Sequence, residues 1–118
     1  MTTYTGGCHC GRVAFDIETE GPITKAMECN CSICSKRGYL LAFFPAARVH
    51  MHTPDSHLST YTFNKQVIQH RFCPVCGVAS FIQGKGHQGS GMYAINVRCL
   101  DGVDLHALKI EPFDGRSR

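Results

Sequence analysis

Cys29-Asn30-Cys31-Ser32-Ile33-Cys34 is the stretch of sequence around which this chain is organised. Three thiols within six residues are too close together to be three independent core cysteines. Ser35 to Gly38 follow, and they predict one short helical turn that glycine ends. A helix that begins near Cys31 points backbone amides at the sulfurs, which lowers thiol pKa values and favours the thiolates that bind metal. The stretch therefore predicts three ligands of a zinc site and leaves the fourth ligand undecided.

The length and composition predict one globular domain over residues 1–118. Hydrophobic residues make up 43% of the chain and charged residues 18%, which is ordinary for a globular protein. No window approaches the roughly 20 apolar residues that a membrane span needs. Residues 1–5 lack the basic and apolar regions of a secretory signal. We therefore expect a cytoplasmic protein with no membrane partner.

Eight cysteines are many for a chain of 118 residues. Because the cytosol keeps thiols reduced and the cysteines are clustered, metal binding is favoured over disulfides or redox chemistry, although a redox or metal-buffering role stays open. The formal charge of +3 would suggest nucleic acid. If seven cysteines bind two zinc ions as thiolates, the total charge moves to about 0. The sequence therefore does not favour a nucleic-acid partner.

The apolar pattern predicts a mainly β protein, with eight or more short antiparallel strands, minimal helix and loops that zinc staples together. Residues 12–18 alternate as a half-buried strand, with Val13, Phe15 and Ile17 on its apolar face. Residues 40–44 form a continuous apolar run, which predicts a strand buried on both faces and ended by Pro45. Further strands are predicted at 48–52, 58–63, 66–72, 78–83 and 92–99, with turns at 64–65 and 101–102.

Two more cysteine pairs divide the metal ligands into two sites. One pair lies in Gly6-Gly7-Cys8-His9-Cys10-Gly11 and the other in Cys73-Pro74-Val75-Cys76-Gly77, each with the glycines of a metal knuckle. Structural zinc takes four protein ligands, whereas catalytic zinc keeps three and an open position. The division that uses every thiol of these groups is a closed site of Cys8, Cys10, Cys73 and Cys76 and an open site of Cys29, Cys31 and Cys34.

Cys99 is the eighth cysteine and the alternative fourth ligand of the triple. On an extended strand it shares a face with Tyr93, Ile95 and Val97, which favours a small buried apolar side chain. If Cys99 instead reached the triple, both sites would be closed and the protein would be structural.

Other polar groups are weaker candidates. The glycine-rich stretch 84–89 matches a phosphate-binding pattern, but no helix is predicted after it, which favours a loop. His50, His52 and His57 are interpreted as surface residues, with metal ligation as the alternative. His70 is a candidate donor that orients the closed site. Lys36 and Arg37 are either a solvated helix end or a receptor for a substrate carboxylate.

The three cysteine groups, in this order and spacing, resemble the glutathione-dependent formaldehyde-activating family, which also includes the centromere protein V domain. Residues 96–100 and Phe113-Asp114-Gly115 resemble the C-terminal part of that family. The resemblance covers nearly the whole chain and implies a zinc-stapled, mostly β fold. It also implies a structural zinc at Cys8, Cys10, Cys73 and Cys76 and a catalytic zinc at Cys29, Cys31 and Cys34. The family's namesake activity joins formaldehyde to glutathione and gives S-hydroxymethylglutathione.

The sequence thus predicts an enzyme, a zinc-dependent carbon–sulfur lyase that acts on a small thiol such as glutathione or on its aldehyde adduct. In this hypothesis the zinc at the open triple binds the substrate sulfur, and Lys36, Arg37 or Arg98 steers an anionic thiol. No sequence feature identifies a general acid or base. The alternative is a binding module for protein or nucleic acid in which both zinc ions are structural. A water or small thiol as fourth ligand of the triple would favour the enzyme.

Overall fold

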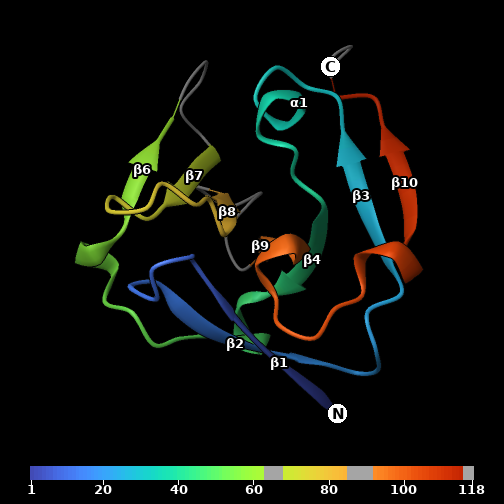
Figure 1. The fold of residues 1–118 in the computed structure, drawn as a ribbon, viewed down its shortest axis with the longest axis horizontal. Helices are drawn as coiled ribbons and strands as arrows, with labels where there is room; N and C mark the ends of the chain where they lie inside the picture. Colours follow the sequence, from blue (N-terminus) through green and yellow to red (C-terminus); the bar gives the residue numbers. More distant parts are fainter. Residues whose placement is uncertain (63–67, 85–91, 116–118) are drawn as a thin grey trace.

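The computed structural model describes residues 1–62, 68–84 and 92–115, and it shows a mainly β protein. The three-stranded sheet has the order β1-β2-β5, and the seven-stranded sheet has the order β10-β3-β4-β9-β8-β7-β6 (Figure 1). The strands are β1 Thr2–Gly7, β2 Ala14–Thr19, β3 Lys25–Cys29, β4 Leu41–Pro45, β5 Val49–Met51, β6 Ser59–Tyr61, β7 Ile68–Phe72, β8 Phe81–Gly84, β9 Met92–Asn96 and β10 Lys109–Phe113. The predicted turn at 64–65 and most of the glycine-rich stretch 84–89 lie outside the described residues.

Helix is as scarce as the pattern predicts. Among the described residues, α1 Cys34–Arg37 is the one α-helix, and it ends at Gly38, whose φ of 69° is left-handed. Four short 3₁₀ segments connect strands: η1 Ala46–Arg48, η2 Asp55–His57, η3 Val97–Cys99 and η4 Leu105–Ala107.

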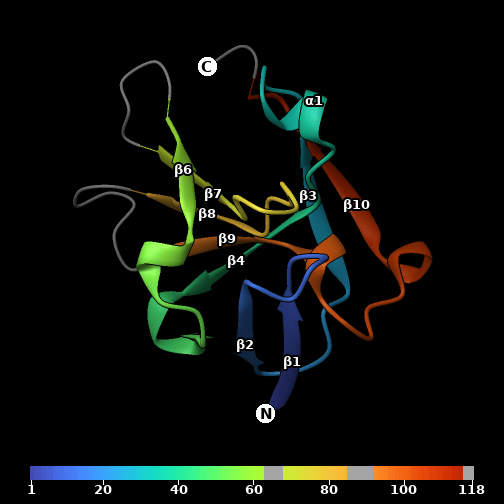
Figure 2. The same ribbon diagram turned by 60° about the vertical axis from the view of Figure 1, so that its left-hand side comes forward.

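The two sheets enclose the main core. The alternating apolar face of β2 is buried as expected, because Phe15 and Ile17, with Val13 just before the strand, are at most 1% exposed. These side chains pack against Phe81 and Ile95 from the larger sheet. Figure 2 shows the three-stranded sheet lying across one side of β4, β9, β8 and β7. The opposite face of the larger sheet carries a second apolar cluster.

The second cluster contains the cysteine triple. Its buried members are Cys29, Cys34, Tyr39, Leu41, Ile82 and Ala94. In Figure 1, α1 and its flanking loops lie at the end of the molecule opposite the N-terminus, close to the ends of β3 and β10. The first cysteine group of the sequence thus sits on a different part of the fold from the triple.

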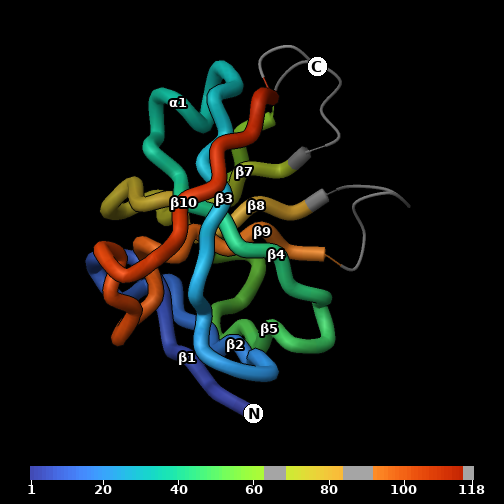
Figure 3. Tube along the Cα trace, turned by 90° about the vertical axis from the view of Figure 1, so that its right-hand side faces the viewer, coloured from blue at the N-terminus to red at the C-terminus, as the bar shows by residue number. Residues whose placement is uncertain are grey.

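One strand pairing differs from the antiparallel arrangement that the sequence predicts. β10 pairs with β3 in parallel, with Phe113 opposite Cys29, and Figure 3 shows the two strands running side by side. Every other strand pair in the described chain is antiparallel. The parallel pairing brings sequence-distant residues 113–115 to the triple, because parallel strands end at the same edge of a sheet.

Two predicted strands also differ in detail. The run 40–44 is not buried on both faces, since Phe43 is 51% exposed and lines a pocket of about 620 Å³. The pocket exists because β3 and β4 pair at one position, Met27 with Leu41, and then separate. The strand predicted over 92–99 ends at Asn96, where the Asn96 side chain accepts a hydrogen bond from the Arg98 N–H and starts η3. Val97 still packs with Ile95 in the main core, so the common face proposed for Tyr93, Ile95, Val97 and Cys99 is wrong at Cys99, which lies outside that cluster.

Candidate metal and thiol site

The structure brings Cys8, Cys10, Cys73 and Cys76 together from two distant knuckles. Cys8 follows β1 and Cys73 follows β7. The sulfur atoms of all four cysteines lie within 4.8 Å of one another. The Cys8–Cys10 and Cys10–Cys73 sulfur pairs are each 3.6 Å apart. Tetrahedral zinc with bonds of about 2.3 Å places its sulfurs about 3.8 Å apart, so this cluster fits one such ion.

Backbone amides surround the sulfurs of this closed cluster. Val13 N–H donates to Cys8 Sγ at 3.2 Å, and Val75 N–H donates to Cys73 Sγ at 3.3 Å. The backbone N–H groups of Val78 and Cys10 lower the pKa of Cys76 to about 6. Hydrogen bonds of this kind favour the thiolate form, which is the form that metal needs.

The sulfurs of Cys29, Cys31 and Cys34 form the second cluster, and they also lie within 4.8 Å of one another. Cys29 ends β3, Cys34 begins α1, and the loop between them folds back so that Cys31 N–H faces Cys29 Sγ at 3.5 Å. The helix begins three residues later than the sequence suggests, although Ser35 N–H already donates to the Cys31 carbonyl at 3.0 Å.

The thiols of Cys31 and Cys34 in this triple differ in acidity. Burial works against the Cys31 thiolate, but hydrogen bonds from the Cys34 backbone and side chain outweigh it, and the pKa of Cys31 lies below its ordinary value. Burial, reinforced by Cys31, raises the pKa of Cys34. Of these two thiols Cys31 loses its proton first, and a bound metal ion would supply the positive charge that keeps the sulfurs of the triple ionised together.

A pocket of about 540 Å³ opens beside the triple. Its wall includes Cys29 and Cys34 together with the polar residues Glu28, Asn30, Ser35 and Asp114. Within the described ranges, both groups of cysteines qualify as metal clusters, and the second contains no fourth His, Cys, Asp or Glu. A triple with three sulfur ligands and a pocket at its side has the layout of an open site.

Cys99 belongs to neither cluster of the described chain. It is partly buried, its thiol faces the Ala79 carbonyl at 3.8 Å, and burial raises its pKa. The structure therefore gives no support to Cys99 as fourth ligand of the triple.

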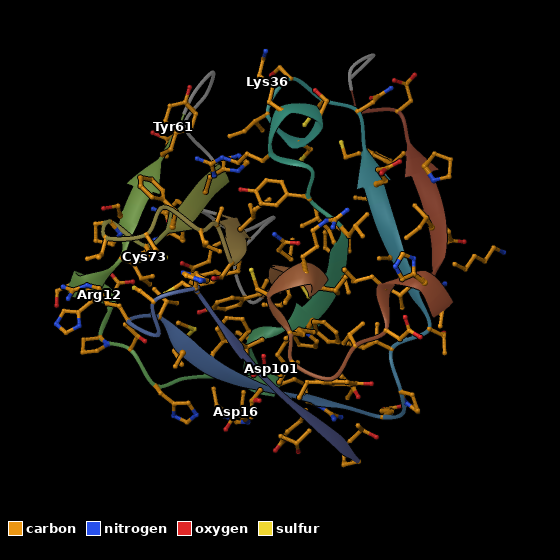
Figure 4. All side chains as sticks on the ribbon, viewed as in Figure 1. Arg12, Asp16, Lys36, Tyr61, Cys73 and Asp101 are labelled. Atoms are coloured by element: carbon orange, nitrogen blue, oxygen red, sulfur yellow. The ribbon has the colours of Figure 1, made fainter. Side chains whose placement is uncertain are left out.

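The candidate cations near the triple have different surroundings. Arg37 Nη1 donates to the Tyr39 hydroxyl at 2.7 Å, and Arg98 Nε donates to the Gly38 carbonyl at 3.1 Å. Lys36 projects outward from α1 (Figure 4).

None of the histidines in the described residues is a member of either sulfur cluster. His52 bonds Asp16 at 2.9 Å and His50 lies 3.5 Å from Glu18, both on the three-stranded sheet. The ring of His70 stacks on Tyr39, on the face of the sheet that carries the triple, whereas the sequence suggested a role at the closed cluster.

Sequence reasoning missed the segment that crosses the triple. Asn30 N–H donates to the Phe113 carbonyl at 3.1 Å, and Asn30 Nδ2 donates to Asp114 Oδ1 at 3.1 Å. A Cβ on Gly115 would lie 2.5 Å from Cys29 Sγ, so only glycine fits there without displacement. The one signal was the Phe113-Asp114-Gly115 sequence itself, which carried part of the family resemblance.

Comparison with known proteins agrees with this geometry. A crystal structure of a Rhodobacter sphaeroides protein is similar, with 30% sequence identity and a TM-score of 0.77 over 92% of this chain and 97% of that chain. A family model described as "Glutathione-dependent formaldehyde-activating enzyme" matches residues 3–113. The chain therefore belongs to the glutathione-dependent formaldehyde-activating enzyme family.

Proposed function

We propose that this protein is a zinc-dependent carbon–sulfur lyase that joins a small thiol of the glutathione type to formaldehyde and cleaves the same adduct in reverse. The observation that carries the proposal is the pocket beside the triple, because two of the three clustered cysteines, Cys29 and Cys34, line it. Family membership supports the same reaction class.

Cys29, Cys31 and Cys34 would hold the catalytic zinc, and Cys8, Cys10, Cys73 and Cys76 would hold the structural one, which gives two ions per chain. A zinc ion at the triple supplies a Lewis-acid centre on which a thiol stays ionised at neutral pH. The chain itself limits how a substrate enters. Gly115 closes the approach over Cys29, and the pocket leaves the side of Asn30 and Ser35 open.

Anionic arms of a peptide-like thiol need a cation at the rim of the pocket. Of the three basic residues considered, Arg37 and Arg98 already bond protein oxygens, and Lys36 extends into solvent. We assign the steering role to Lys36, which follows Ser35 of the pocket wall directly. The proposal takes residues 1–118 as one domain that acts in the cytoplasm, where its eight free cysteines stay reduced.

The test combines zinc analysis with exchange NMR of glutathione and formaldehyde, which measures adduct formation above the spontaneous rate. The wild-type protein is expected to bind two zinc ions and to accelerate exchange. Cys34→Ser should fold, lose one ion and lose the acceleration. Cys99→Ser is the matched control, and it should keep both ions and full activity because Cys99 lies outside both clusters.

Two results would contradict the proposal. One is a wild-type protein that holds both zinc ions and does not accelerate exchange, as a binding module would. The other is a Cys34→Ser protein that keeps wild-type activity.

A further inference from the structure

Cleavage of a hydroxyalkyl thioether needs a group that moves a proton. The hydroxyl proton of the adduct must leave as the carbon–oxygen double bond forms and the carbon–sulfur bond breaks, with the bonding electrons going to sulfur. In the opposite direction the new oxyanion must receive a proton. Metal-bound thiolates do not supply that proton, so a carboxylate or other base at the same pocket would accelerate the transfer over solvent water.

Strand β10 delivers such a group to the triple. Its parallel register places Phe113 opposite Cys29, and the Asn30 N–H to Phe113 carbonyl bond continues the pairing one residue further. The chain then turns so that Gly115 lies against Cys29 Sγ. Asp114 stands between these two anchored residues, and it lines the pocket that Cys29 and Cys34 also line.

The carboxylate of Asp114 is held in place. Asn30 Nδ2 donates to Asp114 Oδ1 at 3.1 Å, and Asn30 lies between two of the triple's cysteines. Glu28 is the other carboxylate of the pocket wall, and it makes no hydrogen bond or ion pair with the residues that the structure describes. A carboxylate fixed by a neighbour is better suited to directed proton transfer than a freely rotating one.

We propose that Asp114 is the proton-transfer residue of this site and that Asn30 is its positioning residue; the proposal rests on the lyase function. In cleavage, Asp114 accepts the hydroxyl proton of the adduct while formaldehyde forms and the thiolate departs. In synthesis, the protonated Asp114 returns that proton to the oxyanion that forms when the thiolate attacks the carbonyl carbon. After cleavage Asp114 passes its proton to the departing thiolate or to solvent water, and before synthesis it takes one from the incoming thiol, so each direction restores the carboxylate. No oxidant or reductant takes part.

The test uses the zinc-loaded full chain and the exchange measurement with glutathione and formaldehyde. Asp114→Asn should lower kcat by about 100-fold or more, which is the usual contribution of general acid–base catalysis, with KM and both zinc ions retained. Asp114→Glu should recover part of kcat. Glu111→Gln is the matched control, since its carboxylate lies on the same strand outside this pocket, and it should match the wild type.

Asn30→Ala tests the positioning role. It should lower kcat about tenfold, with KM and zinc content unchanged, because the carboxylate remains but is no longer held.

Each other outcome decides against the inference. Asp114→Asn with kcat within threefold of the wild type would exclude proton transfer by this residue, and loss of a zinc ion would place Asp114 in metal binding instead. Loss of zinc from Asn30→Ala would likewise overturn the positioning role. Inactive wild-type and Glu111→Gln proteins would overturn the lyase function together with the role of Asp114 that depends on it.

Discussion

At the scale of single residues, Tyr39 is the buried aromatic side chain that packs with the cysteine triple. Its side chain is 1% exposed and packs in one cluster with Cys29 and Cys34. The His70 ring stacks on it at a centroid distance of 6.2 Å, and Arg37 donates to its hydroxyl. Burial raises the pKa of Tyr39, so the phenol stays neutral and donates or accepts hydrogen bonds without adding charge beneath the thiolates.

His70 should make the protein sensitive to mild acid. Burial, and then the nearby Arg37 charge, lower its pKa from 6.5 to about 4. The unfolded chain therefore binds a proton before the folded chain does, and folding stability is lost as pH falls from 6.5 toward 4. We expect the free energy of unfolding in urea to fall more between pH 7 and pH 5 for the wild type than for His70→Gln.

The control for this pH prediction is His52→Gln, because His52 is exposed and paired with Asp16. It should retain the slope of the wild type. Zinc content must be equal at both pH values in all three proteins. Equal slopes for His70→Gln and the wild type would mean that His70 titrates alike in the folded and unfolded states.

At the scale of elements, Arg71 connects β7, β8 and η2. Its side chain is nearly buried, with Nη1 bonded to Gln83 Oε1 at 2.6 Å and Nη2 bonded to Asp55 Oδ1 at 2.9 Å. Both terminal guanidinium nitrogens, Nη1 and Nη2, are used, so the planar fork of arginine is needed here. β7 leads directly into Cys73, and movement of this strand would disturb the closed cluster.

Arg71→Met should lower the free energy of unfolding by about 2–4 kcal/mol, because it removes two charge-assisted hydrogen bonds and leaves Gln83 without its partner. Arg71→Lys should recover less than half of that loss. Arg48→Met is the comparison, since Arg48 pairs with the exposed Glu20 and should change stability by under about 1 kcal/mol. Denaturant unfolding measures all three, and equal effects of Arg71→Met and Arg48→Met would contradict the prediction.

The sequence predicted the parts of the site that local spacing determines. The triple and each of the two pairs are local in sequence, and the four ligands of a closed zinc site led to the joining of the two distant pairs. The sulfurs form the same groups of four and three in the structure. The alternation at 13–17 likewise predicted the core face of β2. By contrast, the exposure of Phe43 depends on where β3 and β4 separate. The apolar run of residues does not indicate where a neighbouring strand ends its pairing.

The sequence pattern also could not predict that Asp114 lies at the pocket of the triple. Its place beside Cys29 comes from a parallel pairing between the third strand and the tenth, and strand order over that distance leaves no periodic signal. The strand predicted through Cys99 failed for a related reason. An asparagine side chain that caps a 3₁₀ turn looks, in sequence, like one more polar position of a strand.

At the scale of the whole molecule, the two cysteine clusters differ in which segments of the chain they connect. The closed cluster joins the loop after β1 to the loop after β7, and Cys73 is wholly buried in the main core. The triple comes from one short loop and lies under α1 at the other apolar cluster. Joining distant segments restricts the unfolded chain far more than joining near ones.

No helix in the described part of the chain is long and apolar enough to cross a membrane.

Metal removal should therefore occur in two stages. With increasing chelator, the first zinc ion should leave the triple with little change in far-ultraviolet circular dichroism, and activity should disappear with it. The second should leave the closed cluster together with loss of the β signal, because binding there is coupled to folding. Zinc release and circular dichroism recorded on one sample test this order, and unfolding that accompanies the first ion would contradict it.

The parallel pairing of β10 with β3 also has a consequence for biosynthesis. A ribosome delivers the loop with Cys29, Cys31 and Cys34 long before it delivers the residues that cover it. During that interval the nascent polypeptide presents three bare, nucleophilic sulfurs to the cell. Metallation at this stage would protect them from oxidants, and the arrival of the final strand would then cover a metal site that is already filled.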